Sequence, residues 1–114
     1  MPIDRENRLN ILFVCSRNQW RSPTAEKIFG EDPRMNVKSA GTSSVARVRV
    51  SEKLLEWADC VMVMERKHRR DLERLFPECV QSSEVVVLDI PDDYQFMDEE
   101  LITLLRDSVD EVFE

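Results

Sequence analysis

The distribution of hydrophobic and polar positions divides the chain into short blocks. A nearly continuous apolar run over residues 9–15 is typical of a strand buried on both faces. Three shorter segments predict further strands: residues 37–40, and the apolar runs at residues 60–64 and 85–88. All of these runs are too short to cross a membrane, so each is expected to lie inside a folded domain.

Four other stretches predict helices from apolar residues at helical spacing, and three of them follow a capping residue. Ser22 is the expected N-cap of the first, with Pro23 as its first residue and Gly30 at its end. The last is the clearest, because one apolar stripe runs along it. The predicted helices cover residues 22–29, the region of 54–57 after the cap Ser51, residues 66–76, and the segment after the cap Asp98.

Strands that alternate with helices predict an α/β fold with a four-stranded parallel sheet flanked by helices on both faces. The length of 114 residues favours one domain spanning residues 1–114, with residues 1–8 as a loose polar lead-in. Ligands of such sheets bind beyond the carboxyl ends of the strands. The loops after Cys15 and Leu88 are therefore expected at the same rim, where chemistry is to be sought.

Composition and charge exclude several classes of function. A net charge of −7 argues against general binding of nucleic acid, which requires a surplus of Lys and Arg. The polar first residues do not form a signal peptide, so we expect a cytoplasmic protein that does not associate with membranes. Three cysteines and one histidine, without a Cys-x-x-Cys pair, predict neither a disulfide framework nor a zinc site.

The loop after the first strand has the composition of an anion-binding site. Five residues separate Cys15 from Arg21, and a loop of this size entering a helix can turn its backbone N–H groups inward. The helix dipole favours a bound dianion and a Cys15 thiolate, to which Ser22 can donate. Arg21 can bind two phosphate oxygens at once. Asn18 lies mid-loop, where a left-handed residue is needed.

The spacing alone is weak, because Cys60 is likewise followed five residues later by Arg66. The residues between them form an apolar strand whose amides belong to a sheet, so Cys60 is predicted to be a buried core thiol. Cys79 receives the same interpretation. For Cys15 the alternative is a buried cysteine at a strand end, with Arg21 in a surface ion pair.

Several segments resemble the low-molecular-weight protein tyrosine phosphatases. Residues 11–15, Asn18 and residues 21–26 resemble the phosphate-loop signature of that family, and residues 39–42 its second-strand motif. Residues 44–47, 58–65 and 70–72 resemble the stretch through its third strand and the following helix, and residues 90–94 its Asp-Pro-Tyr loop. The resemblance covers nearly the whole chain in order.

The resemblance implies a cysteine-dependent phosphatase that needs no metal or cofactor. Cys15 would form a phosphocysteine, Asp92 would act as general acid and then general base, and Arg21 would stabilise the transition state. The implied substrate is a phosphotyrosine protein or a small aryl phosphate, and the product is inorganic phosphate. The implied phosphate-binding residues are Ser16, Arg17, Asn18, Gln19, Trp20, Arg21 and Ser22. Ser39 would support the loop and Tyr94 would line the cleft.

Departures from the family pattern and ambiguous residues leave alternatives open. The segment between Thr42 and Ser44 is shorter, and Ser44 replaces a histidine that braces the loop in the family. His68 lies in a basic run and is predicted on the solvated face of a helix. Asp92 and Asp93 are both candidates for the acid, and the pair also suits an ordinary turn.

Two other functions are compatible with the same loop. One is an arsenate reductase, which would need a relay of further cysteines that only Cys79 could begin to supply. The other is a phosphate- or phosphoprotein-binding module with little turnover. Hydrolysis of a simple aryl phosphate separates the second from a phosphatase.

Overall fold

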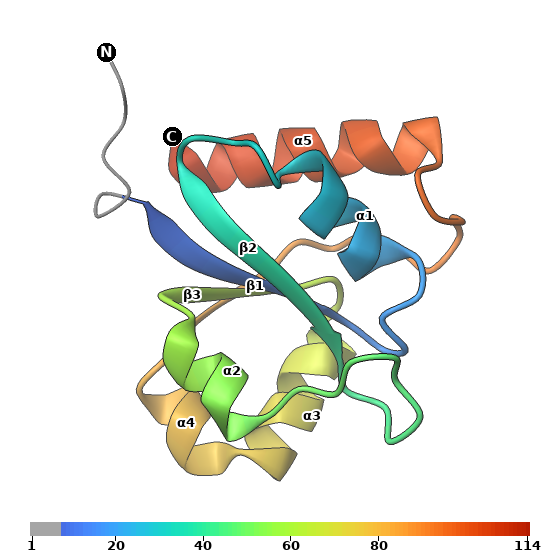
Figure 1. Cartoon of the computed structure of the whole chain (residues 1–114). Coiled ribbons are helices and arrows are strands. Elements are labelled where there is room, and N and C mark those ends of the chain that lie inside the picture. The colour runs from blue at the N-terminus through green and yellow to red at the C-terminus, as the bar shows by residue number, and fades with distance from the viewer. Residues whose placement is uncertain (1–7) are drawn as a thin grey trace.

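The structure, a computed structural model that describes residues 8–114, is built on one parallel sheet (Figure 1). Its four strands lie in the order β2-β1-β3-β4. The predicted four-stranded parallel sheet is therefore confirmed. The strands are β1 (Leu9–Cys15), β2 (Met35–Gly41), β3 (Cys60–Val63) and β4 (Glu84–Val87).

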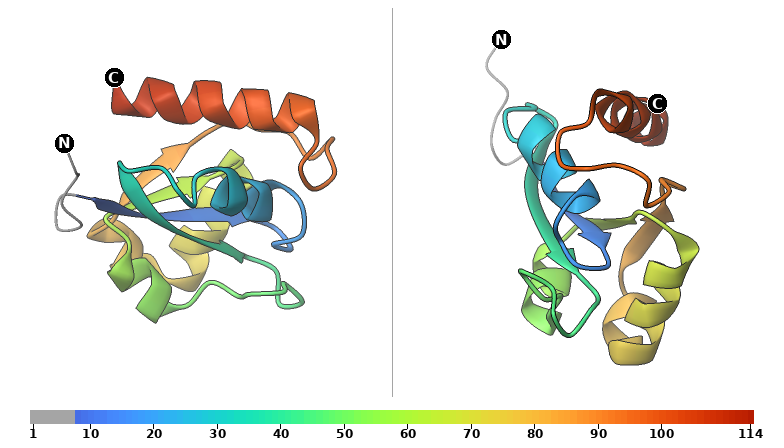
Figure 2. Two further views of the ribbon diagram at one scale, coloured as in Figure 1. Left: turned by 45° about the horizontal axis from the view of Figure 1, so that its top comes forward. Right: turned by 90° about the vertical axis from the view of Figure 1, so that its right-hand side faces the viewer.

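Helices cover both faces of this sheet, also as predicted (Figure 2). On one face lie α1 (Arg21–Ile28) and α5 (Glu99–Phe113), which contact each other as well as the sheet. On the other lie α2 (Glu52–Trp57), α3 (Arg66–Leu75) and α4 (Pro77–Gln81). None of the helices in residues 8–114 is long and apolar enough to cross a membrane.

Strand β1 is central because it pairs with β2 on one side and with β3 on the other. Its side chains alternate between the two cores, as those of a strand must. Ile11, Phe13 and Cys15 join the core under α1 and α5, whereas Leu12 and Val14 join the core under α2 and α3. The last residue of this rigid strand is Cys15, so the sheet fixes the position of its sulfur.

Capping explains where several helices begin. Ser51 accepts a hydrogen bond from the Leu54 amide at the start of α2, and Asp98 accepts one from the Glu100 amide at the start of α5. Both caps were predicted correctly. The predicted start of α1 was two residues too late: the helix begins at Arg21 with Trp20 as N-cap, and the Ser22 hydroxyl is engaged inside the preceding loop.

Two further differences concern segment ends. Pro77 was expected only to end a helix, yet it also opens α4, since proline suits the first turn of a helix. The polar lead-in predicted at residues 1–8 falls on residues 1–7, which lie outside the described residues, and on Arg8.

Candidate functional site

The loop between β1 and α1 encloses a cavity of about 320 Å³ at the carboxyl end of the sheet. Cys15 and Arg21, at the two ends of the loop, both line it, and Asp92 reaches it from the segment after β4. The expectation that the loops after Cys15 and Leu88 share one rim is thus met. The lining residues are Cys15, Ser16, Arg17, Gln19, Trp20, Arg21 and Asp92.

The sulfur of Cys15 lies within hydrogen-bond distance of two groups of its own loop. The Ser22 hydroxyl oxygen is 2.9 Å from Sγ, and the Asn18 backbone N–H donates to Sγ over 3.2 Å. Asn18 has a φ of 57°, a left-handed conformation that asparagine tolerates better than most residues. This turn aims the Asn18 amide back at the sulfur, and it was predicted from the sequence.

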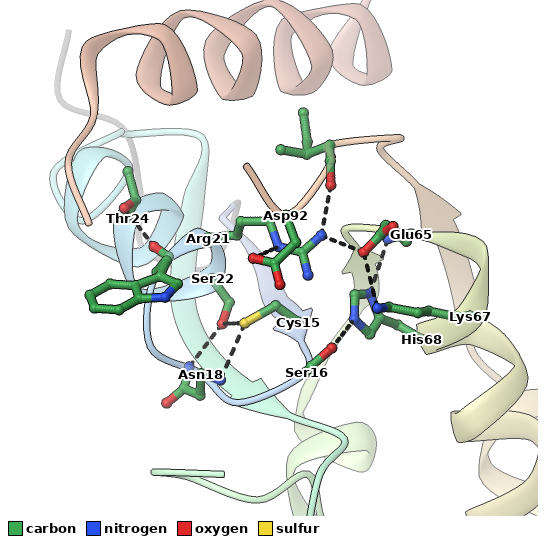
Figure 3. A network of polar contacts seen from close by, with 12 residues as sticks. Cys15, Ser16, Asn18, Arg21, Ser22, Thr24, Glu65, Lys67, His68 and Asp92 are labelled. Atoms are coloured by element: carbon green, nitrogen blue, oxygen red, sulfur yellow. Dashed lines mark hydrogen bonds and ion pairs between the residues drawn. The ribbon is translucent and has the colours of Figure 1, made fainter. Parts of the chain in front are cut away.

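The side chain of Asn18 braces the loop from inside. Its Nδ2 donates to the Ser22 and Ser39 hydroxyl oxygens, each over 2.9 Å. Ser39 in turn donates to Glu26 on α1, also over 2.9 Å. Because Ser22 accepts from Asn18, its own proton is directed to the sulfur or to the more distant carbonyl of Ala40. The hydrogen bonds expected of Asn18, Ser22 and Ser39 are present, and Figure 3 shows the one between Asn18 and Ser22.

Arg21 is buried, with 2% of its surface exposed, so the alternative of a surface ion pair is wrong. Its Nη1 donates to Glu65 Oε2 over 2.6 Å and to the Ile90 carbonyl over 2.7 Å. Its Nε is 3.6 Å from Asp92 Oδ1. Partial burial raises the pKa of Glu65, but the hydrogen bond and charge of Arg21 outweigh this and leave that pKa lowered.

The segment after β4 places its candidate residues differently. Asp92 lines the cavity with about half of its side chain exposed, whereas Asp93 is exposed outside it. Tyr94 is not among the lining residues; it packs partly against the core under α5. The aromatic ring that does line the cavity is Trp20, which is 42% exposed.

His68 occupies a place that the sequence prediction excluded. It is fully buried, its Nε2 is 2.8 Å from the Ser16 hydroxyl oxygen, and its Nδ1 accepts the Glu65 backbone N–H over 3.0 Å. The prediction of a solvated face was wrong because His68 lies four residues before the buried Leu72, on the same side of α3. That spacing was the available signal, and the basic neighbours concealed it.

The segment after β2 holds the outer side of the loop. The backbone N–H groups of Thr42, Ser43 and Arg47 donate to the carbonyls of residues 15, 16 and 17. Gly41 contacts the loop so closely that an added Cβ would lie 2.5 Å from the Ser16 carbonyl oxygen. Ser44 is exposed, so the brace comes from backbone groups of this segment.

The other two cysteines lie away from the cavity. Cys60 is buried in β3 as predicted, and burial together with the charges of Glu84 and Asp59 raises the pKa of its thiol to about 11. Cys79 lies on α4 and packs against the core on the opposite face of the sheet from Cys15. Neither thiol lines the cavity beside Cys15.

Comparison with known proteins agrees with this geometry. Residues 10–54 match the family model of the low molecular weight phosphotyrosine protein phosphatases. These residues contain the whole loop and its brace from β2, so the resemblance predicted from the sequence is confirmed. No curated protein matches the chain at a significant level.

Solved structures of phosphatases have the same fold. The tyrosine phosphatase Wzb from Escherichia coli K30, in complex with phosphate, is 23% identical with a TM-score of 0.72 over 90% of this chain and 94% of that one. Wzb from Vibrio vulnificus, in complex with benzylphosphonate, is 24% identical with a TM-score of 0.68 over 91% and 93%. The YwlE arginine phosphatase from Geobacillus stearothermophilus is 22% identical with a TM-score of 0.69 over 92% and 92%.

Proposed function

We propose that this chain, which has the fold and the loop sequence of low-molecular-weight phosphatases, hydrolyses phosphate monoesters through a phosphocysteine on Cys15. The observation that carries the proposal is the convergence of the Cys15 sulfur, the Arg21 guanidinium and the Asp92 carboxylate on a single cavity. The Ser22 hydroxyl and the Asn18 amide at the sulfur suit a thiolate, which is the nucleophilic form.

The first step transfers the phosphoryl group to sulfur. The Cys15 thiolate attacks phosphorus, an S–P bond forms, and the bond from phosphorus to the ester oxygen breaks. Asp92, in its protonated form, gives its proton to the departing oxygen, so that an alcohol or phenol leaves. The exposed position of Asp92 at the mouth of the cavity supports this role, because the leaving group must point toward solvent.

The second step releases phosphate. The Asp92 carboxylate takes a proton from a water molecule, the water oxygen attacks phosphorus, and the S–P bond breaks to return the thiolate. Arg21 and the loop amides would hold the equatorial oxygens in both steps. Glu65 and the Ile90 carbonyl both bind Nη1 of Arg21, and Nε lies 3.6 Å from Asp92 Oδ1, so the N–H groups of Nη2 stay available for the phosphoryl group. Neither step needs a metal or a cofactor.

An aryl phosphate, free or as phosphotyrosine in a protein, is the proposed substrate class. Trp20 lines the cavity and is 42% exposed, so it offers a ring face against which an aromatic leaving group can stack. The family resemblance implied this stacking role for Tyr94, which does not line the cavity. Because phosphatases of this fold include one described as acting on arginine, phosphoarginine belongs in the assay beside phosphotyrosine.

Two variants test the proposal. Cys15→Ser should abolish hydrolysis of p-nitrophenyl phosphate, and Asp92→Asn should lower kcat about a hundredfold without weakening substrate binding, because general acid catalysis contributes at this scale. Asp93→Asn is the matched control and should stay close to wild type. Binding of phosphate without hydrolysis by the wild type would instead favour a binding module, and hydrolysis that survives Cys15→Ser would refute the proposal.

Arsenate reduction has less support in the described residues. A relay would have to pass a disulfide from Cys15 to a second thiol, and Cys79 lies across the sheet from it. Thioredoxin-dependent arsenate turnover that is lost in Cys79→Ser would be needed to revive this function.

A further inference from the structure

The imidazole of His68 joins the start of α3 to the wall of the cavity. On one side, Nδ1 accepts the backbone N–H of Glu65, the N-cap of α3. On the other, Nε2 lies 2.8 Å from the hydroxyl oxygen of Ser16 (Figure 3). His68 does not line the cavity itself, whereas Ser16 does.

These two contacts determine where the ring proton lies. A backbone N–H can only donate, so Nδ1 must offer a lone pair to Glu65. The proton of the neutral ring is therefore on Nε2, which donates to Ser16. Burial and the positive charges of Arg21 and Lys67 lower the pKa of His68 to about 4, against the opposing effect of Glu65 and Asp71. The ring is neutral at physiological pH.

The direction of this bond fixes what the Ser16 hydroxyl can do. A hydroxyl has two lone pairs and one proton. Because Ser16 accepts from His68, its own proton stays free for another acceptor. The cavity that Ser16 lines with Cys15 and Arg21 is where a phosphoryl oxygen would lie under the proposed function.

We propose that His68 is a positioning residue, which turns the Ser16 hydroxyl into a hydrogen-bond donor for a phosphoryl oxygen in the Cys15 cavity. The inference rests on the proposed function for the nature of the ligand and adds a recognition group beyond the loop amides and Arg21. His68 would orient the Ser16 hydroxyl as a neutral imidazole that does not contact the substrate.

A purely structural role is the competing explanation, because His68 also caps α3 and so supports Glu65, which holds Arg21. The two explanations differ in one respect. If His68 acts through the Ser16 hydroxyl, its effect on phosphate binding must vanish when that hydroxyl is removed. If it acts through the cap, its effect is independent of Ser16.

A double-mutant cycle on binding of inorganic phosphate separates them, with calorimetry on the 114-residue chain as the measurement. Each of Ser16→Ala and His68→Leu should raise the Kd about tenfold, because each removes or misdirects a hydrogen bond from the Ser16 hydroxyl to the charged phosphate. The double variant should be no weaker than the worse single one, within about twofold. A loss equal to the product of the two single losses would overturn the inference.

Rescue provides a second arm that remains informative if His68→Leu does not fold. Glutamine suits the third position of a helix as a capping group, and its amide also carries a donor for Ser16. His68→Gln should therefore keep the wild-type Kd within about twofold, and a loss as large as that of Ser16→Ala would count against the inference. Arg70→Gln, on the exposed side of α3, is the matched control.

Measuring the Kd of inorganic phosphate also allows this inference to be tested separately from the proposed function. Inorganic phosphate binds without turnover, so a wild-type protein that hydrolyses nothing could still show the predicted coupling. Hydrolysis that depends on Cys15, combined with independent effects of Ser16 and His68 on the Kd, would leave the phosphatase proposal standing and remove this one.

Discussion

Nη1 of Arg21 lies 2.6 Å from Oε2 of Glu65, and this contact joins the loop between β1 and α1 to the start of α3. Arg21 is almost completely buried, whereas the Glu65 side chain is 31% exposed. The pair therefore serves less to stabilise the fold than to hold the guanidinium in one orientation. A fork fixed in this way can bind a dianion without first losing rotamer freedom.

Removing the charge of Glu65 should impair the reaction more than the fold. Glu65→Gln leaves an amide oxygen for Arg21 but weakens a charge-assisted hydrogen bond, which corresponds to about a tenfold loss of kcat/KM. Steady-state kinetics with p-nitrophenyl phosphate provide the measurement. Lys67→Gln is the control, since Lys67 is exposed and contacts the same carboxylate from outside at 3.6 Å. Equal losses in both variants would contradict a specific role for Glu65.

The buried imidazole of His68 should make stability depend on pH. Its pKa is about 4 in the folded protein and about 6.5 when unfolded, so the unfolded chain binds more protons between these values. Stability should thus fall as pH drops from about 6.5 to 4, by on the order of 3 kcal/mol. Urea unfolding of wild type and His68→Gln at several pH values measures the difference, in which the carboxylate contributions common to both proteins cancel.

The low pKa of His68 can also be checked directly by spectroscopy. His68 is the only histidine in the chain, so its imidazole resonances titrate without overlap. A midpoint near pH 4 is expected, and a midpoint at the ordinary value of about 6.5 would show that the ring is not held as described.

Gly41 should tolerate no side chain. A Cβ there would lie 2.5 Å from the Ser16 carbonyl oxygen, 2.7 Å from the Ala46 Cβ and 3.0 Å from the Asn18 amide nitrogen. Gly41→Ala must therefore displace the loop, and we expect a loss of kcat/KM of about a hundredfold and a loss of stability of 1–3 kcal/mol, roughly the cost of overpacking. Phosphatase assays and urea unfolding are the measurements.

The second glycine of the chain supplies the control for that prediction. At Gly30 the nearest atom to an added Cβ is the Glu26 carbonyl oxygen at 3.2 Å, away from the loop. Gly30→Ala should keep its activity, so a comparable loss in both glycine variants would argue against a specific effect at Gly41.

Cys60 and Arg66 have the same spacing as Cys15 and Arg21, and this repeat provides a test of which cysteine is the nucleophile. Cys60 begins a strand whose amides are paired in the sheet, and its thiol has a pKa of about 11. Cys60→Ala should keep full hydrolysis at a cost of about 1 kcal/mol in stability, since only one small buried group is lost. Loss of activity in a folded Cys60→Ala protein would contradict the assignment of the nucleophile to Cys15.

Much of the fold could be predicted from the sequence because local patterns specify it. The apolar run of β1, the caps Ser51 and Asp98, and the left-handed Asn18 are each determined by the residues themselves. That residues 1–114 form one domain stays a prediction.

The supporting part of the site could not be predicted, because it depends on which strands are neighbours. Glu65 meets Arg21 across 44 positions only because β3 lies beside β1 in the sheet. Whether Trp20 or Tyr94 lines the cavity likewise depends on how the segment after β4 turns back over the core. His68 is the exception: its spacing to Leu72 was readable, and a helical wheel of residues 66–75 would have placed both on the buried face.

The central claim is a covalent bond between phosphorus and the sulfur of Cys15. Trapping the intermediate tests it most directly: the Asp92→Asn protein, whose second step is slowed, is mixed with p-nitrophenyl phosphate, quenched within the first turnover, digested and analysed by mass spectrometry. We predict one phosphoryl group on the peptide that contains Cys15, and none on those with Cys60 or Cys79. A burst of p-nitrophenol with the phosphoryl group on another residue, or turnover with no covalent intermediate, would contradict the mechanism.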